Sequence, residues 1–93
     1  MKIVIVGAGK IGYSLAEELA NENHDITVVD IEKEKVKLLS DTLDVMTLCG
    51  NGAAISVQRE ANVDESDLLI AVTAQDELNM LACIVARKLG CKN

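Results

Sequence analysis

Residues 2–12 read KIVIVGAGKIG: an apolar run that predicts a buried strand, followed by three spaced glycines. A helical pattern comes next. Strand, glycine turn and helix in this order are the context in which GxGxxG indicates dinucleotide binding. Gly7 is expected to allow the tight turn, Gly9 to let the backbone approach a pyrophosphate, and Gly12 to let helix and strand pack closely. The N-terminus of the helix would then face the phosphates with its free N–H groups.

Composition limits the kinds of partner. The 93 residues suffice for one domain, and 49% of them are hydrophobic, which is enough for a core. Only 1% are aromatic, and the net charge is −6. Nucleic acid is therefore not expected as a partner, because phosphate contacts from basic side chains dominate that affinity. An acidic surface is typical of a cytoplasmic protein.

Neither membrane insertion nor a metal site is predicted. The apolar run Ile3–Val6 is far shorter than the roughly 20 residues of a membrane span, and it lacks the features of a signal peptide. Cys49, Cys83 and Cys91 are odd in number without CxxC spacing, which favours free thiols in a reducing compartment. Together with His24 they offer too few ligands for a metal ion.

Apolar runs and helical patterns alternate along the rest of the chain. Strands are predicted at 2–6, 25–30, 45–48 and 68–73, and helices at 10–22, 32–41, 53–60 and 75–89. Residues 73–76 resemble a capping box at the start of the last helix, and Gly90 would end that helix. Right-handed crossovers then predict a Rossmann-like α/β fold, a doubly wound parallel sheet with strand order 3-2-1-4.

Asp30 is the second strong signal. It ends the second strand, where the dinucleotide fingerprint expects an acidic residue that binds the adenosine ribose. A carboxylate accepts from both ribose hydroxyls and repels a 2′-phosphate, so Asp30 favours NAD(H), or another adenine nucleotide with a free ribose, over NADP(H). The alternative role is N-cap of the following helix, and the two roles are compatible.

Three other strand-end features allow two interpretations each. Asn51, between Gly50 and Gly52, either contacts adenine or forms an ordinary turn in which Asn and Gly tolerate positive φ. Thr73-Ala74 either faces the pyrophosphate or distal ribose, or caps the last helix. Lys10 either screens phosphate charge or is simply solvated.

Segments well beyond the glycine loop carry a family resemblance. Residues 1–12 (MKIVIVGAGKIG), 29–30 (VD), 49–52 (CGNG) and 69–82 (LIAVTAQDELNMLA) are similar to the RCK (KTN) domains in regulatory subunits of Trk potassium-uptake systems. The segment Ala71–Asn79 is far more specific than the glycine loop. The resemblance covers nearly all 93 residues.

The resemblance implies a regulatory domain that is not an enzyme. Such a domain binds NAD or NADH, with ATP/ADP as alternatives, forms homo-oligomers, and gates a membrane potassium transporter from the cytoplasmic face of the membrane. It also implies that residues 1–93 are one dinucleotide-binding unit, the N-terminal piece of a longer domain, ending just before a fifth strand. By position, the site residues would be Gly7, Ala8, Gly9, Lys10, Ile11 and Gly12 at the pyrophosphate, Asp30 at the ribose, Asn51 by the adenine, and Thr73 and Ala74 at the distal half. Asp76, Glu77 and Asn79 would order the start of the last helix.

Helix periodicity predicts which faces are buried. Ile11, Leu15, Ala16 and Leu19 share one face of the first helix. In the last helix, one set of residues should face the core, while Met80 and Ile84 lie nearly opposite and either contact another subunit or are stray apolar residues. The expected core-facing residues of that helix are Leu78, Leu81, Ala82, Val85 and Leu89.

Three functions remain open at this point. The first is a nucleotide-sensing regulatory domain of a potassium transporter, and the second is the cofactor half of an NAD-dependent dehydrogenase. The third is an interaction module with a vestigial site. An enzyme needs a positioned acid, base or hydride acceptor. No such group is expected near the site, because His24 falls in the turn at the opposite end of the sheet.

Overall fold

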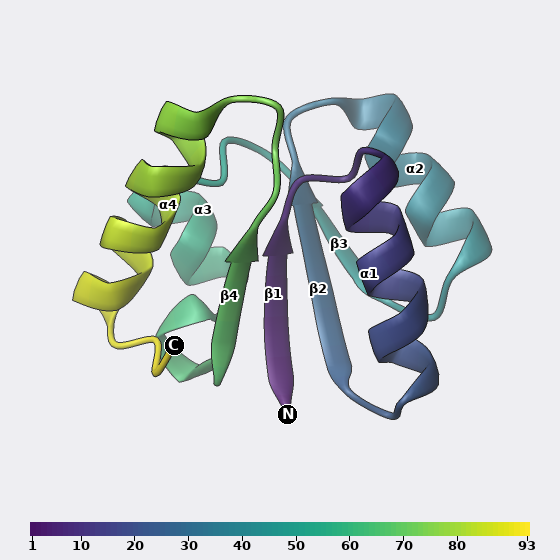
Figure 1. The fold of residues 1–93 in the computed structure, drawn as a ribbon, viewed down its shortest axis with the longest axis horizontal. Helices are drawn as coiled ribbons and strands as arrows, with labels where there is room; N and C mark the ends of the chain where they lie inside the picture. The colour runs from purple at the N-terminus through teal and green to yellow at the C-terminus, as the bar shows by residue number, and fades with distance from the viewer.

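The computed structural model describes residues 1–93 as a four-stranded parallel sheet covered by helices on both faces (Figure 1). The strand order is β3-β2-β1-β4, as predicted, so the fold is Rossmann-like. In chain order the elements are β1 (Lys2–Val6), α1 (Lys10–Asn21), β2 (Asp25–Asp30), α2 (Lys33–Thr42), β3 (Met46–Cys49), α3 (Ile55–Glu60), η1 (Val63–Glu65), β4 (Leu68–Ala71) and α4 (Asp76–Leu89).

The largest boundary differences are two residues each, at the start of α3, which is Ile55 rather than Ala53, and at the end of β4. This strand stops at Ala71 rather than at Thr73, because the chain leaves the sheet after Val72 N donates to Val6 O (2.8 Å). The short 3-10 helix η1 was not predicted, and it follows Asn62 in the left-handed conformation (φ 61°). Gly90 is left-handed too (φ 108°) and ends α4 as predicted.

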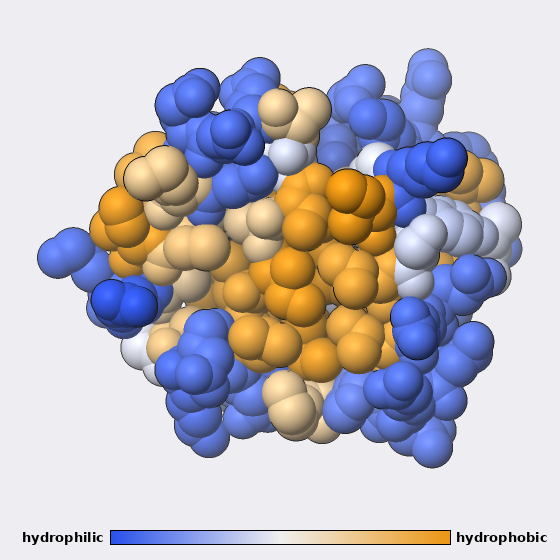
Figure 2. Space-filling model, viewed as in Figure 1, coloured by the Kyte–Doolittle hydropathy of each residue, from blue (hydrophilic) through white to orange (hydrophobic).

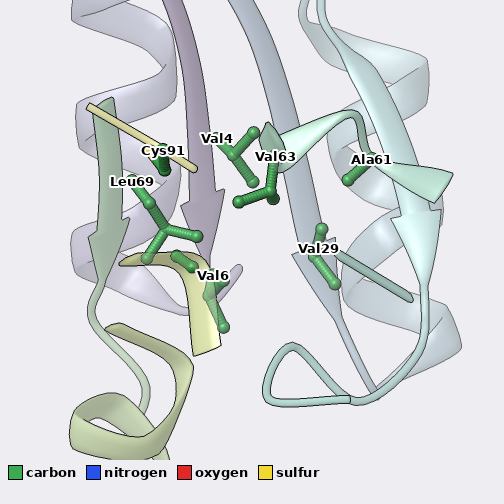
Figure 3. Packing of buried hydrophobic residues seen from close by; sticks show 8 residues of the cluster. Val4, Val6, Val29, Ala61, Val63, Leu69 and Cys91 are labelled. Atoms are coloured by element: carbon green, nitrogen blue, oxygen red, sulfur yellow. The ribbon is translucent and has the colours of Figure 1, made fainter. Parts of the chain in front are cut away.

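Two apolar clusters flank the sheet. On one face, α1 and α2 cover side chains that include Ile3 and Ile5 of β1. On the other face, α3, η1 and α4 cover alternate side chains such as Val4 and Val6 of the same strand, and Figure 3 shows Val63 of η1 against Val4. Consecutive residues of β1 therefore point into opposite clusters, and the strand is buried on both faces. This double burial explains why its sequence is a continuous apolar run.

One residue of each predicted helix face needs correction, Ile11 in α1 and Leu81 in α4. Ile11 is 64% exposed although Ala16 on the same helix is fully buried, because small Gly12 and Ala16 carry the close contact with the sheet. In α4, the buried residues are Ala82 and Ala86, and Leu81 is 51% exposed. Small side chains let these helices approach the sheet closely, while the larger Leu15 and Leu19 of α1 still pack against the core as predicted.

Large apolar side chains stay exposed at several positions on the surface. Met80 and Ile84 on α4 are more than half exposed, as their helical phase predicts. Figure 2 shows further apolar side chains between α4 and α1, over β4 and β1. Three residues in and just after β4, Leu68, Ile70 and Val72, pack against the cluster that α1 and α2 cover but are only partly buried. Helices α1 and α2 therefore cover the β2 side of this face better than the β4 side.

No helix has the length and apolarity needed to cross a bilayer. No three side chains of the His, Cys, Asp and Glu types are grouped so that they could hold a metal ion. All three cysteines are free thiols; Cys49 and Cys83 are exposed and Cys91 is buried.

Candidate functional site

A cleft of about 530 Å³ lies at the carboxyl ends of all four strands, where Figure 1 shows the strand arrowheads and their loops converging. This size is typical of a small-ligand site. The position is the switch point of the strand order, which is where α/β sheets bind ligands. Its lining includes most predicted site residues, namely Gly7, Gly9, Lys10, Ile11, Asp30, Asn51, Thr73 and Ala74.

Gly7 and Gly12 are required by the protein itself. Gly7 has φ +120°, and a Cβ there would lie 3.0 Å from the carbonyl carbon and oxygen of Val72. A Cβ on Gly12 would collide with the carbonyl oxygen of Gly7. The glycine turn, the start of α1 and the end of β4 are therefore packed backbone against backbone, as the roles predicted for Gly7 and Gly12 require.

Gly9 is different, because nothing in the protein requires a glycine there. Its backbone (φ −75°, ψ −162°) is open to any residue. A Cβ built on it would meet no protein atom within 4 Å, yet Gly9 lines the cleft. A side chain at this position would project into the cleft, beside the first turn of α1.

The first turn of α1 offers unused donors. Gly9 is the N-cap residue and no side chain caps the helix. The first amide of the helix with a protein acceptor is that of Tyr13, which donates to Gly9 O (2.8 Å). The N–H groups of Lys10, Ile11 and Gly12 are thus free, an arrangement that with the helix dipole is suited to receive an anion.

Asp30 connects two loops of the site. Its Oδ2 accepts from Ala8 N (2.7 Å) and its Oδ1 accepts from Glu32 N (2.7 Å). The N-cap of α2 is Glu32, so Asp30 is not the cap residue itself but braces the turn before it. Each carboxylate oxygen keeps lone-pair capacity for a further donor.

The Gly50-Asn51-Gly52 turn is shaped by crowding rather than by positive φ, which none of its residues adopts. A Cβ on Gly52 would collide with Val6, and one on Gly50 would lie 2.9 Å from Val57 Cγ2. Asn51 Oδ1 accepts from Ala53 N (2.9 Å), so the side-chain oxygen forms the turn. The Asn51 amide nitrogen makes no hydrogen bond to the protein.

Thr73 is held by Asn79 instead of acting as the predicted helix cap. The N-cap of α4 is Gln75, and no side chain caps it, which contradicts the capping box. Asn79 Oδ1 accepts from both Thr73 N (2.9 Å) and Thr73 Oγ1 (2.6 Å), and its Nδ2 donates to Thr73 O (3.0 Å). Asp76 and Glu77 are exposed in the first turn of α4, where negative side chains interact favourably with the positive end of the helix dipole.

Sequence reasoning missed two charged residues of the cleft, Glu32 and Lys35. They form an ion pair (Nζ to Oε2, 2.6 Å), and this hydrogen bond, with the attraction of the same carboxylate, raises the pKa of Lys35. The sequence signal for this pair was the spacing of three residues between Glu32 and Lys35, which places an acid and a base on the same side of a helix that begins near Asp30. Lys10, also in the cleft, has no ion-pair partner in the structure.

Comparison with known proteins assigns the family. Residues 3–93 match the TrkA-N domain. The chain belongs to the TrkA-N domain family. A curated relative, the Trk system potassium uptake protein TrkA of Halomonas elongata, is 49% identical over 89 residues. The alignment covers 96% of this TrkA-N domain but 20% of that protein, so the chain spans about a fifth of the relative's length.

Solved structures share the fold of this TrkA-N domain at low identity. The TrkA-N domain of the inner membrane protein ybaL from Escherichia coli has a TM-score of 0.88 at 21% identity, over 96% of this chain and 65% of that chain. The Kef CTD of Shewanella denitrificans in AMP-bound form has a TM-score of 0.81 at 15% identity, over 95% of this chain and 52% of that one.

Proposed function

We propose that this TrkA-N domain binds an adenine dinucleotide, NAD or NADH, in the cleft at the carboxyl ends of the strands. The observation that carries the proposal is Gly9. Neither its backbone conformation nor any neighbour forbids a side chain, so the glycine keeps the cleft open beside the free N–H groups of α1. A pyrophosphate is the ligand group that these donors would bind.

The other strand ends suit the rest of such a ligand. Asp30 would accept from the ribose hydroxyls with the lone pairs that Ala8 N and Glu32 N leave free, and its charge disfavours a 2′-phosphate. Asn51 would donate its free amide nitrogen to an adenine ring nitrogen. ATP or ADP shares the adenosine and phosphate groups and is the alternative ligand; AMP is bound by the similarly folded Kef domain.

The proposed role is regulatory and not catalytic. The relatives at 43–49% identity carry the name of a Trk potassium uptake protein, and a domain in such a protein would gate a membrane potassium transporter subunit. It would do so from the cytoplasm, peripheral to the inner face of the membrane and as a homo-oligomer. Ligand control requires that the nucleotide bind one conformation more tightly than another.

The test is calorimetric titration of the folded protein with NADH, NAD⁺, ATP and ADP. Wild-type protein is expected to bind at least one of them, and Gly9→Ala is expected to weaken that binding about tenfold or more, since the methyl group occupies the phosphate position. Ser14→Ala, exposed on the next turn of α1, is the matched control and should bind like wild type. Folded wild-type protein that binds none of the four would overturn the proposal.

A further inference from the structure

Asn79 makes three hydrogen bonds to one residue. Its carboxamide accepts from the N–H and the hydroxyl of Thr73 and donates to the carbonyl oxygen of Thr73. The orientation of the amide follows from this chemistry, because only the nitrogen can face a carbonyl and only the oxygen can serve two donors. Every polar group of Thr73 is therefore committed to the protein.

These bonds replace a strand partner. The sheet ladder of β4 continues only to Val72 N, which donates to Val6 O (2.8 Å). Beyond that point the Thr73 peptide groups have no neighbouring strand, and partly buried backbone groups need a partner. Asn79, one turn into α4, supplies it.

The peptide that Asn79 holds is a wall of the glycine turn. A Cβ on Gly7 would lie 3.0 Å from Val72 C and 3.1 Å from Thr73 N, so this peptide packs directly on Gly7. Thr73 and Ala74 line the cleft, whereas Asn79 does not. Asn79 thus reaches the site only through Thr73.

We propose that Asn79 is a positioning residue for the phosphate side of the cleft. It fixes the Thr73 peptide against Gly7, and it leaves the N–H of Ala74, which has no protein acceptor, as the donor that the end of β4 presents to a ligand. Thr73 itself acts as a spacer and not as a ligand contact. This inference rests on the proposed nucleotide function and assigns the phosphate contact within that site.

The first test separates phosphate binding from adenosine binding. Asn79→Leu keeps the approximate size but loses all three bonds, and it should weaken ADP about tenfold while changing adenosine little. Cys83→Ser, exposed one turn further along α4 and outside the cleft, is the control and should leave both affinities unchanged. An unchanged ADP affinity, or an equal loss for ADP and adenosine, would overturn the role of Asn79 alone. Wild-type protein that binds NADH or NAD⁺ but neither ADP nor adenosine would overturn this inference and leave the proposed function standing, whereas wild-type protein that binds none of these compounds would overturn both.

Asn79→Asp provides a second test, which still decides the question if the leucine variant is too unstable to assay. Its carboxylate can still accept from Thr73 N and Oγ1 but cannot donate to Thr73 O, whereas the protonated acid can. The ADP affinity of this variant relative to wild type should therefore recover as pH falls through about 4, the ordinary pKa of an aspartic acid. In wild type, amide exchange by NMR should show Thr73 protected without ligand and Ala74 protected only with ADP. A pH-independent affinity ratio, or an Ala74 amide that ADP does not protect, would contradict the proposal.

Discussion

Gly9 and Gly12 of the glycine turn differ in what excludes a side chain. At Gly12 the obstacle is the carbonyl oxygen of Gly7, a backbone atom that cannot move without the turn. At Gly9 there is no obstacle in the protein. The same residue type therefore serves packing at one position and, in the proposed function, a ligand at the other.

Gly12→Ala is expected to destabilise the fold by about 3 kcal/mol or more, since the methyl group forces α1 away from the turn. Urea unfolding monitored by circular dichroism would measure the loss. Gly9→Ala is the matched variant and should stay within about 0.5 kcal/mol of wild type. Equal stability of the two alanine variants would contradict this distinction.

Among the secondary-structure elements, α3 joins the Gly50-Asn51-Gly52 turn to α4 through one buried residue. Gln58 is 1% exposed and donates Nε2 to Gly52 O (2.8 Å) and to Ala82 O (2.9 Å). Its Oε1 has no partner. A buried unpaired oxygen costs stability, so the net contribution of this glutamine is smaller than its two bonds suggest.

Gln58→Met should accordingly change the free energy of unfolding by less than about 1.5 kcal/mol, because the loss at Gly52 O is offset by removal of the orphan Oε1. Gln58→Glu has the same shape but places a carboxylate against two carbonyl oxygens. It should cost about 3 kcal/mol or more at neutral pH. Denaturant titrations measure the free energy of unfolding of both variants. A methionine variant as unstable as the glutamate variant would contradict this expectation and show that the two bonds from Gln58 Nε2 outweigh the cost of the unpaired Oε1.

Across the molecule as a whole, Asp67 ties together the amino ends of the sheet and the C-terminal residues. Its Oδ2 accepts from Lys2 N (2.8 Å) at the start of β1, and its Oδ1 pairs with Lys92 Nζ (3.3 Å). The backbone hydrogen bond from Lys2, followed by the bond from Lys92, lowers the pKa of Asp67 from its ordinary value of 3.8. Beside it, Leu69 N donates to Asn93 O (2.8 Å) along the outer edge of β4.

A lowered native pKa gives a definite pH dependence. The stabilisation from Asp67 is fully present above pH 3.8, the ordinary value, and is lost as pH falls through the lower native pKa. Asp67→Asn should thus melt below wild type at neutral pH, and the two melting temperatures should converge in strong acid. Asp44→Asn, an exposed position, is the control and should show no such convergence. A constant difference between Asp67→Asn and wild type at all pH values would refute the linkage.

The order of elements and the location of the cleft were predictable because they depend on local patterns. Alternation of apolar runs and helical periods predicts parallel βα units, and right-handed crossovers then leave one strand order. The roles of Gly7 and Gly12 follow from a spacing within one turn. The position of Asp30 in the cleft was predictable for the same reason, because it ends a strand at the expected distance from the glycines. Its contact with a ribose stays a prediction.

Contacts between residues distant in the chain depended on the tertiary structure. Gly52 needs its small size because of Val6 on β1, and Asp30 is bound by Ala8 as well as by its own turn. Ile11 lies outward because Gly12 and Ala16 bring α1 against the sheet. Periodicity gives the phase of a helix but not the depth at which its smallest residues pack, so no local pattern could supply these results.

Asn79 combines a position that the sequence predicts with a contact that only the tertiary structure shows. The sequence identifies it within a specific motif and places it one turn into α4, but assigns it no partner. Only the folded chain shows that its carboxamide holds Thr73 against the glycine turn of β1. Local sequence determines which residues can form hydrogen bonds, whereas packing of the glycine turn against the end of β4 determines which peptide groups are left without a strand partner and need one.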